Sequence, residues 1–200
     1  MSRIAQWRST VDDPPITRAL FSDTRLSWLW LLVRLYMGYT WINSGLGKLA
    51  STEWTVTGNS LKNYWVGAVA IPATGKPAVT FDWYRDFLVF MLNGGHYVWF
   101  GKLVVAGELL IGTAMILGAF VGVAALAGGF MNWNFMMAGT ASINPVLFPL
   151  SVLLIMAWKT AGYVGVDRVL LPALGTPWRP GIVFVRGGTP QPSAVGAETP

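Results

Sequence analysis

The chain has 200 residues, of which 54% are hydrophobic and only 12% are charged, and it carries a net charge of +5. Soluble domains usually contain about 25% charged residues, so this composition argues against a soluble domain and predicts a membrane protein. With no cysteine and one histidine, His96, the sequence excludes disulfide frameworks, thiolate metal sites, iron–sulfur clusters and bis-histidine haem within one chain. We expect no covalent cofactor and no metal site.

The hydrophobic runs predict four membrane helices. Residues 1–25 are polar and include Pro14 and Pro15, so we expect a loose cytoplasmic arm there. The run 26–47 is longer than the core of a signal peptide and predicts the first span. The run 97–137 is long enough for two spans, because about 20 residues cross a ~30 Å hydrocarbon core. We expect the remaining helices at 97–117, 120–139 and 146–163, with a tight reversal at 118–122.

Four spans place both termini on the same side of the membrane, and the basic residues favour the cytoplasm. Eight of them lie in the two terminal regions, against five in the 49–96 loop and its flanks. The first group is Arg3, Arg8, Arg18, Arg25, Lys159, Arg168, Arg179 and Arg186, and the second is Lys48, Lys62, Lys76, Arg85 and Lys102. We expect residues 171–200 to form a flexible tail, with a possible short strand at 181–186. Attraction to anionic lipid explains the basic charge without nucleic acid.

The long connection between the first two spans is rich in aromatic residues. Within 81–92, apolar residues recur at helical spacing, which predicts a short helix at the membrane interface, where aromatic rings prefer to lie. This segment either caps the end of the bundle or forms a lid over a binding site. The expected fold is therefore an all-α integral membrane four-helix bundle with an aromatic-rich interfacial loop between its first two helices.

Two charges are expected deep in the bilayer. Counted along their helices, Arg34 lies roughly 12 Å and Glu108 roughly 14 Å from the cytoplasmic face. Antiparallel neighbours would bring the guanidinium and the carboxylate to the same level, where they would form an ion pair. This pair is either a structural salt bridge or a functional one, with Glu108 accepting a proton beside a quinone headgroup or Arg34 balancing an anionic substrate.

A second polar group is expected toward the outer side of the bundle. Asparagine in lipid must hydrogen-bond to another helix or to a ligand, and lysine near a helix end either binds an anion or extends to the interface. Converging, these side chains would form a positively charged pocket under the aromatic loop, suited to an anion or a quinone headgroup. The candidate residues are Asn43, Lys48, His96, Lys102, Asn132, Asn134 and Asn144.

Several motifs resemble those of the DoxX/DoxD family of small membrane proteins. The first helix carries an intramembrane arginine and a Gly-x-x-Lys-Leu-like end, and the second carries Glu-x-x-x-Gly. The resemblance covers about residues 26–170, in the segments 32–38, 44–49, 107–112, 132–140, 144–149 and 162–167.

This resemblance implies a four-helix membrane protein in respiratory redox chemistry. DoxD-type members include a subunit of thiosulfate:quinone oxidoreductase, which passes electrons from thiosulfate to a membrane quinone and makes tetrathionate. The expected role is therefore a membrane redox subunit with quinone as diffusible co-substrate and with a partner subunit. On this reading Glu108, Arg34 and His96 are the candidate catalytic residues. The alternative is a non-catalytic membrane anchor or assembly subunit of a larger oxidoreductase complex.

Overall fold

The computed structural model describes residues 13–175, which form helices joined by short turns and contain no β-strand. The expected all-α class is confirmed. In chain order the helices are α1 (Pro15–Ser22), a 3₁₀ turn (Thr24–Leu26), α2 (Ser27–Leu49), α3 (Thr52–Thr55), α4 (Asn59–Val69), α5 (Asp82–Asn93), α6 (Tyr97–Leu117), α7 (Val121–Met137), α8 (Asn144–Met156), α9 (Trp158–Ala161) and α10 (Asp167–Ala173).

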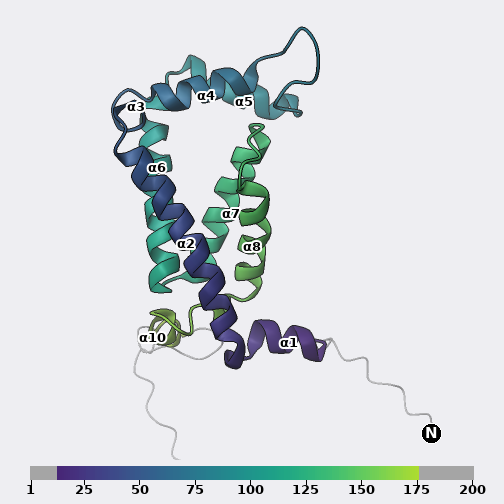
Figure 1. Ribbon diagram of the computed structural model, residues 1–200, viewed down its shortest axis with the longest axis vertical. Coiled ribbons are helices and arrows are strands. Elements are labelled where there is room, and N and C mark those ends of the chain that lie inside the picture. The colour runs from purple at the N-terminus through teal and green to yellow at the C-terminus, as the bar shows by residue number, and fades with distance from the viewer. Residues whose placement is uncertain (1–12, 176–200) are drawn as a thin grey trace, which may run out of the picture.

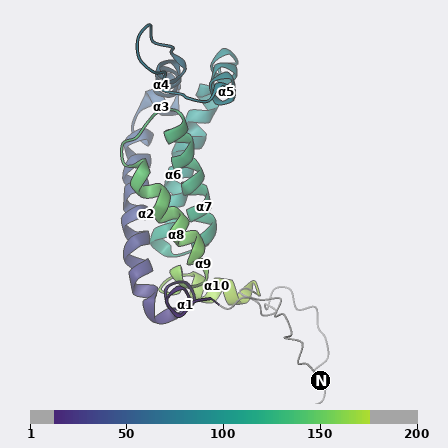
Figure 2. The same ribbon diagram turned by 90° about the vertical axis from the view of Figure 1, so that its right-hand side faces the viewer.

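Four of these helices, α2, α6, α7 and α8, run along the long axis of the molecule (Figures 1 and 2). The helices α3, α4 and α5 lie across one end, which we call the cap end, and α1 and α10 lie at the other, the α10 end (Figure 1). A core of apolar side chains, including Met37, Met115 and Leu154, fills the interior between the long helices. The first and last helices of the described chain thus lie at the same end of the molecule.

Small residues set the register between α2 and α6, which run antiparallel. A Cβ atom added to Gly38 would lie 3.0 Å from the carbonyl oxygen of Gly112, and one added to Gly112 would lie 2.6 Å from Cγ1 of Ile42. The two backbones therefore approach more closely than larger residues would allow. Farther along, a Cβ atom on Gly45 would lie 3.3 Å from Cβ of Glu108, which fixes Glu108 opposite the last turns of α2.

The reversal expected at 118–122 is present. Gly118 ends α6 in the left-handed region with φ of 68°, where glycine has no steric cost, and Phe120 follows with φ of 50°. The expected span 146–163 is interrupted, because α8 ends at Met156 and the short α9 follows. Pro145 lies in the first turn of α8, where its missing N–H is not needed.

The loose arm expected over residues 1–25 is corrected in its described part. Pro15 begins helix α1, and Leu20 and Phe21 pack against the core of the bundle. The ring of Phe21 stacks on Trp30 with centroids 5.6 Å apart, and Nε1 of Trp30 donates to the carbonyl of Leu20 at 2.8 Å. The proline pair therefore begins a helix whose Leu20 and Phe21 are partly buried against the bundle.

The tail expected over 171–200 is described only to residue 175, and α10 extends to Ala173 within it. The possible strand at 181–186 lies outside the described residues. By length and composition, one helix among residues 13–175 is long and apolar enough to cross a membrane, and it is α6. α8 is apolar but has only 13 residues.

Candidate functional site

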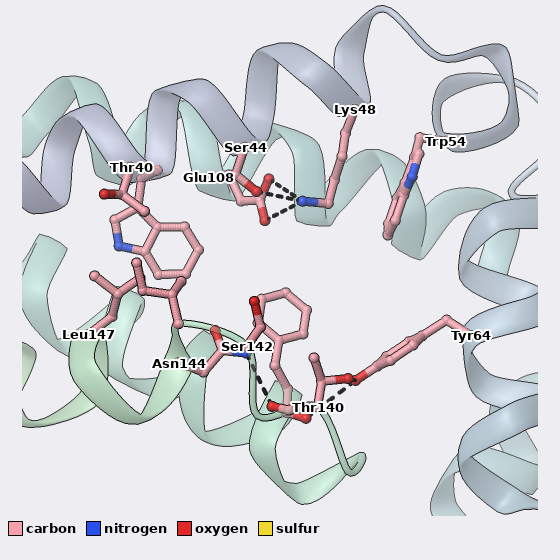
Figure 3. Close-up of a pocket in the computed structure, with 13 residues that line it drawn as sticks. Thr40, Ser44, Lys48, Trp54, Tyr64, Glu108, Thr140, Ser142, Asn144 and Leu147 are labelled. Carbon is pink, nitrogen blue, oxygen red and sulfur yellow. Dashed lines mark hydrogen bonds and ion pairs between the residues drawn. The ribbon is translucent and has the colours of Figure 1, made fainter.

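A cavity of about 290 Å³ opens between the long helices at the cap end (Figure 3). We call it the Glu108 cavity, after the buried acid in its wall. Its volume is near the lower end of the range for small-molecule sites, about 300–1,000 Å³. Its polar lining residues are Thr40, Ser44, Lys48, Tyr64, Glu108, Thr140, Ser142 and Asn144, and its apolar ones are Trp41, Trp54, Phe135, Ile143 and Leu147.

An ion pair between α2 and α6 forms one wall of the cavity. Nζ of Lys48 lies 2.9 Å from both carboxylate oxygens of Glu108 and 2.6 Å from the hydroxyl of Ser44. Glu108 is only 1% exposed, whereas the Lys48 side chain is 20% exposed. The ring of Trp54 covers the ammonium at 5.2 Å. The pair thus neutralises a carboxylate that would otherwise be costly to bury.

Hydroxyl groups line the opposite side, where the cap meets the turn between α7 and α8 (Figure 3). The hydroxyl of Thr140 donates to that of Tyr64 at 2.7 Å, and Tyr64 donates to the carbonyl of Phe135 at 3.2 Å. The amide nitrogen of Asn144 donates to the carbonyl of Thr140 at 3.2 Å. This chain of hydrogen bonds holds α4 against α7 at the mouth of the cavity.

Two tyrosines of the cap have raised pKa values. Burial raises the pKa of Tyr84 to about 12, with a smaller contribution from the nearby Tyr64. Burial also raises the pKa of Tyr64, and the hydrogen bond from Thr140 partly opposes that rise. The hydroxyl of Tyr84 donates to the backbone carbonyl of Asn134 at 3.0 Å and contacts its side-chain oxygen at 3.2 Å. Both tyrosines therefore fasten the cap to α7 in their protonated form.

The ion pair expected between Arg34 and Glu108 is wrong. Arg34 lies at the α10 end, where it donates to the carbonyl of Val164 and packs against Gly118 and Gly165. Arg34 is about 15 Å along α2 from Ser44, which neighbours Glu108. Sequence counting assumed that α2 and α6 begin and end at matching levels, but α2 extends beyond the end of α6. Arg34 therefore faces the last residues of α6, and Lys48 is the partner of Glu108.

At the α10 end, a buried carboxylate accompanies Arg34. Asp167 is 2% exposed and accepts hydrogen bonds from the backbone nitrogens of Phe120 at 2.7 Å and Val121 at 2.9 Å. It therefore caps the first turn of α7, whose N–H groups have no partner within the helix. The backbone nitrogen of Asp167 in turn donates to the carbonyl of Gly118 at 2.8 Å. These contacts enclose the charges within packed backbone.

The positive pocket expected from asparagine, lysine and histidine forms only in part. Lys48 and Asn144 line the Glu108 cavity, but Asn43 and Lys102 lie on exposed faces of α2 and α6. His96 lies outside the cavity, where Nδ1 accepts a hydrogen bond from Nε1 of Trp99 at 3.2 Å. The position of each residue around its helix axis explains this result, because side chains at the same depth point in different directions.

The two asparagines of α7 also lie outside the lining of the cavity. Asn134 donates to the carbonyl of Phe130 at 2.8 Å and contacts Tyr84, so it connects the cap to the bundle. Asn132 is fully buried, and neither of its amide atoms has a hydrogen-bond partner among the described residues. Nε1 of Trp41, which packs one turn away beside Gly128, is likewise without a partner in this part of the chain.

Five of the polar lining residues were not expected from the sequence, namely Thr40, Ser44, Tyr64, Thr140 and Ser142. Ser44 lies one turn before Lys48, and that i, i+4 spacing is the one signal that identifies it. The other four are small or aromatic polar residues with no distinctive spacing. Among residues 13–175 no group of three or more histidine, aspartate and glutamate side chains is placed to hold a metal ion.

Comparison of the chain with protein-family models, with curated proteins and with solved structures gives no match. The Glu108 cavity itself therefore carries the functional argument.

Proposed function

We propose that the four long helices form a multi-pass bundle in the cell membrane, with both termini in the cytoplasm. The outward faces of these helices expose large apolar side chains, among them Leu32 at 67%, Leu110 at 70% and Leu126 at 61%. So many exposed large apolar side chains are unusual on soluble monomers and suit contact with lipid. The shared position of α1 and α10 supports termini on one side (Figure 1).

Within that membrane bundle, the Glu108 cavity is proposed to bind the headgroup of a membrane quinone. The observation that carries this proposal is a buried, neutralised ion pair in the wall of a cavity whose other lining is aromatic, aliphatic and hydroxylic. The cavity as a whole has no net charge, which suits a neutral ring bearing oxygen atoms better than a free anion. Flat aromatic rings such as Trp41 and Trp54 suit stacking on such a ring.

In this proposal the ion pair exchanges protons with a bound headgroup. Quinone supplies the electron-accepting chemistry when bound. Lys48 holds the proton to be delivered. Glu108 accepts that proton and passes it to the headgroup oxygen. With thiosulfate as donor, two thiosulfate ions form one S–S bond to give tetrathionate and release two electrons. Those electrons, with two protons, convert one quinone into quinol.

The resemblance to the DoxX/DoxD family supports this reading, and membership in that family is part of the proposal. On this view the chain is a DoxD-type redox subunit working with a partner subunit. The pocket expected for an anion or a quinone headgroup coincides only in part with the Glu108 cavity, because His96, Lys102 and Asn43 lie outside it. Thiosulfate would therefore donate electrons at the surface or through the partner.

The test uses the full chain purified in detergent, with decylubiquinone as acceptor and thiosulfate as donor. We expect saturable quinone binding, observed as quenching of the fluorescence of Trp41 and Trp54, and thiosulfate-dependent quinone reduction. Glu108→Gln removes the proton-transfer group and should lower turnover by about 100-fold or more. Glu53→Gln, a matched change at an exposed glutamate of the cap, should leave turnover unchanged.

The outcomes separate the redox subunit from the membrane anchor. If the folded protein neither binds decylubiquinone nor reduces it, the quinone proposal fails, and the anchor or assembly role is favoured. If Glu53→Gln lowers turnover as much as Glu108→Gln, the assigned role of the cavity is wrong.

A further inference from the structure

The hydrogen-bond donors in the wall of the Glu108 cavity are already in use. Lysine has three N–H donors, and those of Lys48 are directed at two oxygens of Glu108 and one of Ser44. A ligand acceptor would therefore have to displace one of these bonds before it could bind to the ammonium.

The hydroxyl donors of Thr40, which lies on α2 like Lys48, and of Thr140 and Tyr64, on the other side of the cavity, are committed in the same way. Thr40 donates to the carbonyl of Tyr36 at 2.9 Å, Thr140 donates to Tyr64, and Tyr64 donates to the carbonyl of Phe135. The hydroxyls of Ser44 and Ser142 remain able to donate or accept, since a hydroxyl rotates to suit its partner.

The acceptors of the cavity, by contrast, have spare capacity. A carboxylate offers about four lone-pair sites, and Lys48 occupies one on each oxygen of Glu108. Asn144 donates one N–H of its amide to the carbonyl of Thr140, which leaves its amide oxygen to accept and its second N–H to donate (Figure 3). The free donors of the cavity are therefore neutral hydroxyl and amide groups, whereas the free lone pairs of Glu108 are a charged acceptor, which forms the stronger hydrogen bond.

We propose that the Glu108 cavity binds the reduced, hydroxyl-bearing quinol more tightly than the oxidised quinone, with a ligand O–H group donating to Glu108. A quinol offers two O–H donors, whereas a quinone offers acceptors alone. This inference rests on the proposed function, and it names the redox form that the cavity recognises.

Preference for the reduced form has a consequence for electron transfer. A ligand held more tightly when reduced is a stronger oxidant when bound than when free in the membrane. For a two-electron couple, each tenfold preference raises the reduction potential by about 30 mV. The cavity would therefore assist electron transfer from a weakly reducing donor.

The experiment measures binding of decylubiquinol and decylubiquinone separately, without oxygen, to the full chain in detergent by titration calorimetry. We expect quinol to bind at least about tenfold more tightly, as a hydrogen bond to a charged acceptor would give. A quinol analogue with both hydroxyls methylated should bind as weakly as the quinone, because it has lost its donors. This comparison needs no variant protein.

A substitution should reverse the preference. Glu108→Gln introduces an amide donor and frees N–H groups of Lys48, so this variant should bind quinone more tightly than quinol. Glu53→Gln, at an exposed site, should keep the wild-type preference. Equal affinities, or tighter quinone binding, by the wild-type chain would overturn the inference while leaving the quinone site in place. Absence of binding by both forms would instead overturn the proposed function.

Discussion

The two ends of the bundle treat buried charge in different ways. At the α10 end, Arg34 donates to a backbone carbonyl in the turn before α10, Asp167 accepts from backbone nitrogens at the start of α7, and glycines pack against both side chains. At the cap end, Lys48 and Glu108 satisfy each other beside a cavity lined with hydroxyls. Buried charge thus bonds to backbone groups at one end and forms a side-chain ion pair in the wall of the Glu108 cavity at the other. Arg34 is not among the residues that line the Glu108 cavity, so it is less suited than Lys48 or Glu108 to act on a ligand there.

The largest effect that would test this contrast is expected at Asp167. Asp167→Ala leaves two backbone N–H groups of α7 uncapped and Arg34 without its neighbouring carboxylate. We expect a loss of about 3–5 kcal/mol in the free energy of unfolding, measured by thermal or detergent unfolding of the purified chain. Asp86→Ala, at an exposed aspartate of α5, should cost less than about 0.5 kcal/mol. Equal losses of stability in the two variants would contradict the role assigned to Asp167 at the α10 end.

Packing around Arg34 provides the second test. Gly118→Ala places a methyl group on the guanidinium at a residue with φ of 68°. Gly75→Ala introduces a similar backbone strain, at φ of 94°, but meets no atom within 4 Å. We expect a loss of about 2–4 kcal/mol for Gly118 and about 1 kcal/mol for Gly75, because only the first adds a collision. If both variants unfold alike, the guanidinium is not held as described.

The cap-end pair is tested by a double-mutant cycle. Glu108→Gln and Lys48→Met should each destabilise the chain, since each leaves one buried polar partner unsatisfied. The double variant should be more stable than the sum of the single changes predicts, with a coupling of about 1–3 kcal/mol. It should fold yet fail to support quinone reduction. Lys102→Met, on the exposed face of α6, should show no coupling to Glu108→Gln.

The smallest effect concerns the attachment of the cap at high pH. Because the pKa of Tyr84 is raised from 10.0 to about 12, the folded chain keeps its proton in a range where the unfolded chain loses it. Stability should therefore fall as pH rises from about 10 to about 12, by about 2 kcal/mol. Tyr84→Phe should be less stable at neutral pH and should show a shallower fall. An unchanged slope in that variant would assign the effect to another group.

Much of the helical layout could be predicted from the sequence, because the hydrophobic runs indicate where the long helices lie. The helix α6 has the bounds that its apolar run predicts, and α5 follows the apolar spacing in 81–92. Helix α1 was missed, since Pro14 and Pro15 suggested an irregular arm. The register between helices was also missed, because small residues such as Gly38 and Gly112 set it through contacts that a single sequence does not show.

Only the charged residues of the candidate site could be predicted from the sequence. Glu108 and Lys48 stand out against an apolar background, but the partner of Glu108 depended on where α6 ends relative to α2. Hydroxyls such as Thr140 and Tyr64 come together through the turn after α7 and the position of α4. No sequence pattern predicts the contact between Thr140 and Tyr64, because the two residues are 76 positions apart.

The contact between Asp167 and the start of α7 also bears on the order in which the protein can mature. The carboxylate acts on backbone nitrogens 46 and 47 residues earlier in the chain. During synthesis α7 therefore leaves the ribosome with its first turn uncapped. That turn stays uncapped until the segment after α9 has been made. A chain stopped before Asp167 would possess all four long helices and lack the group that secures the third of them.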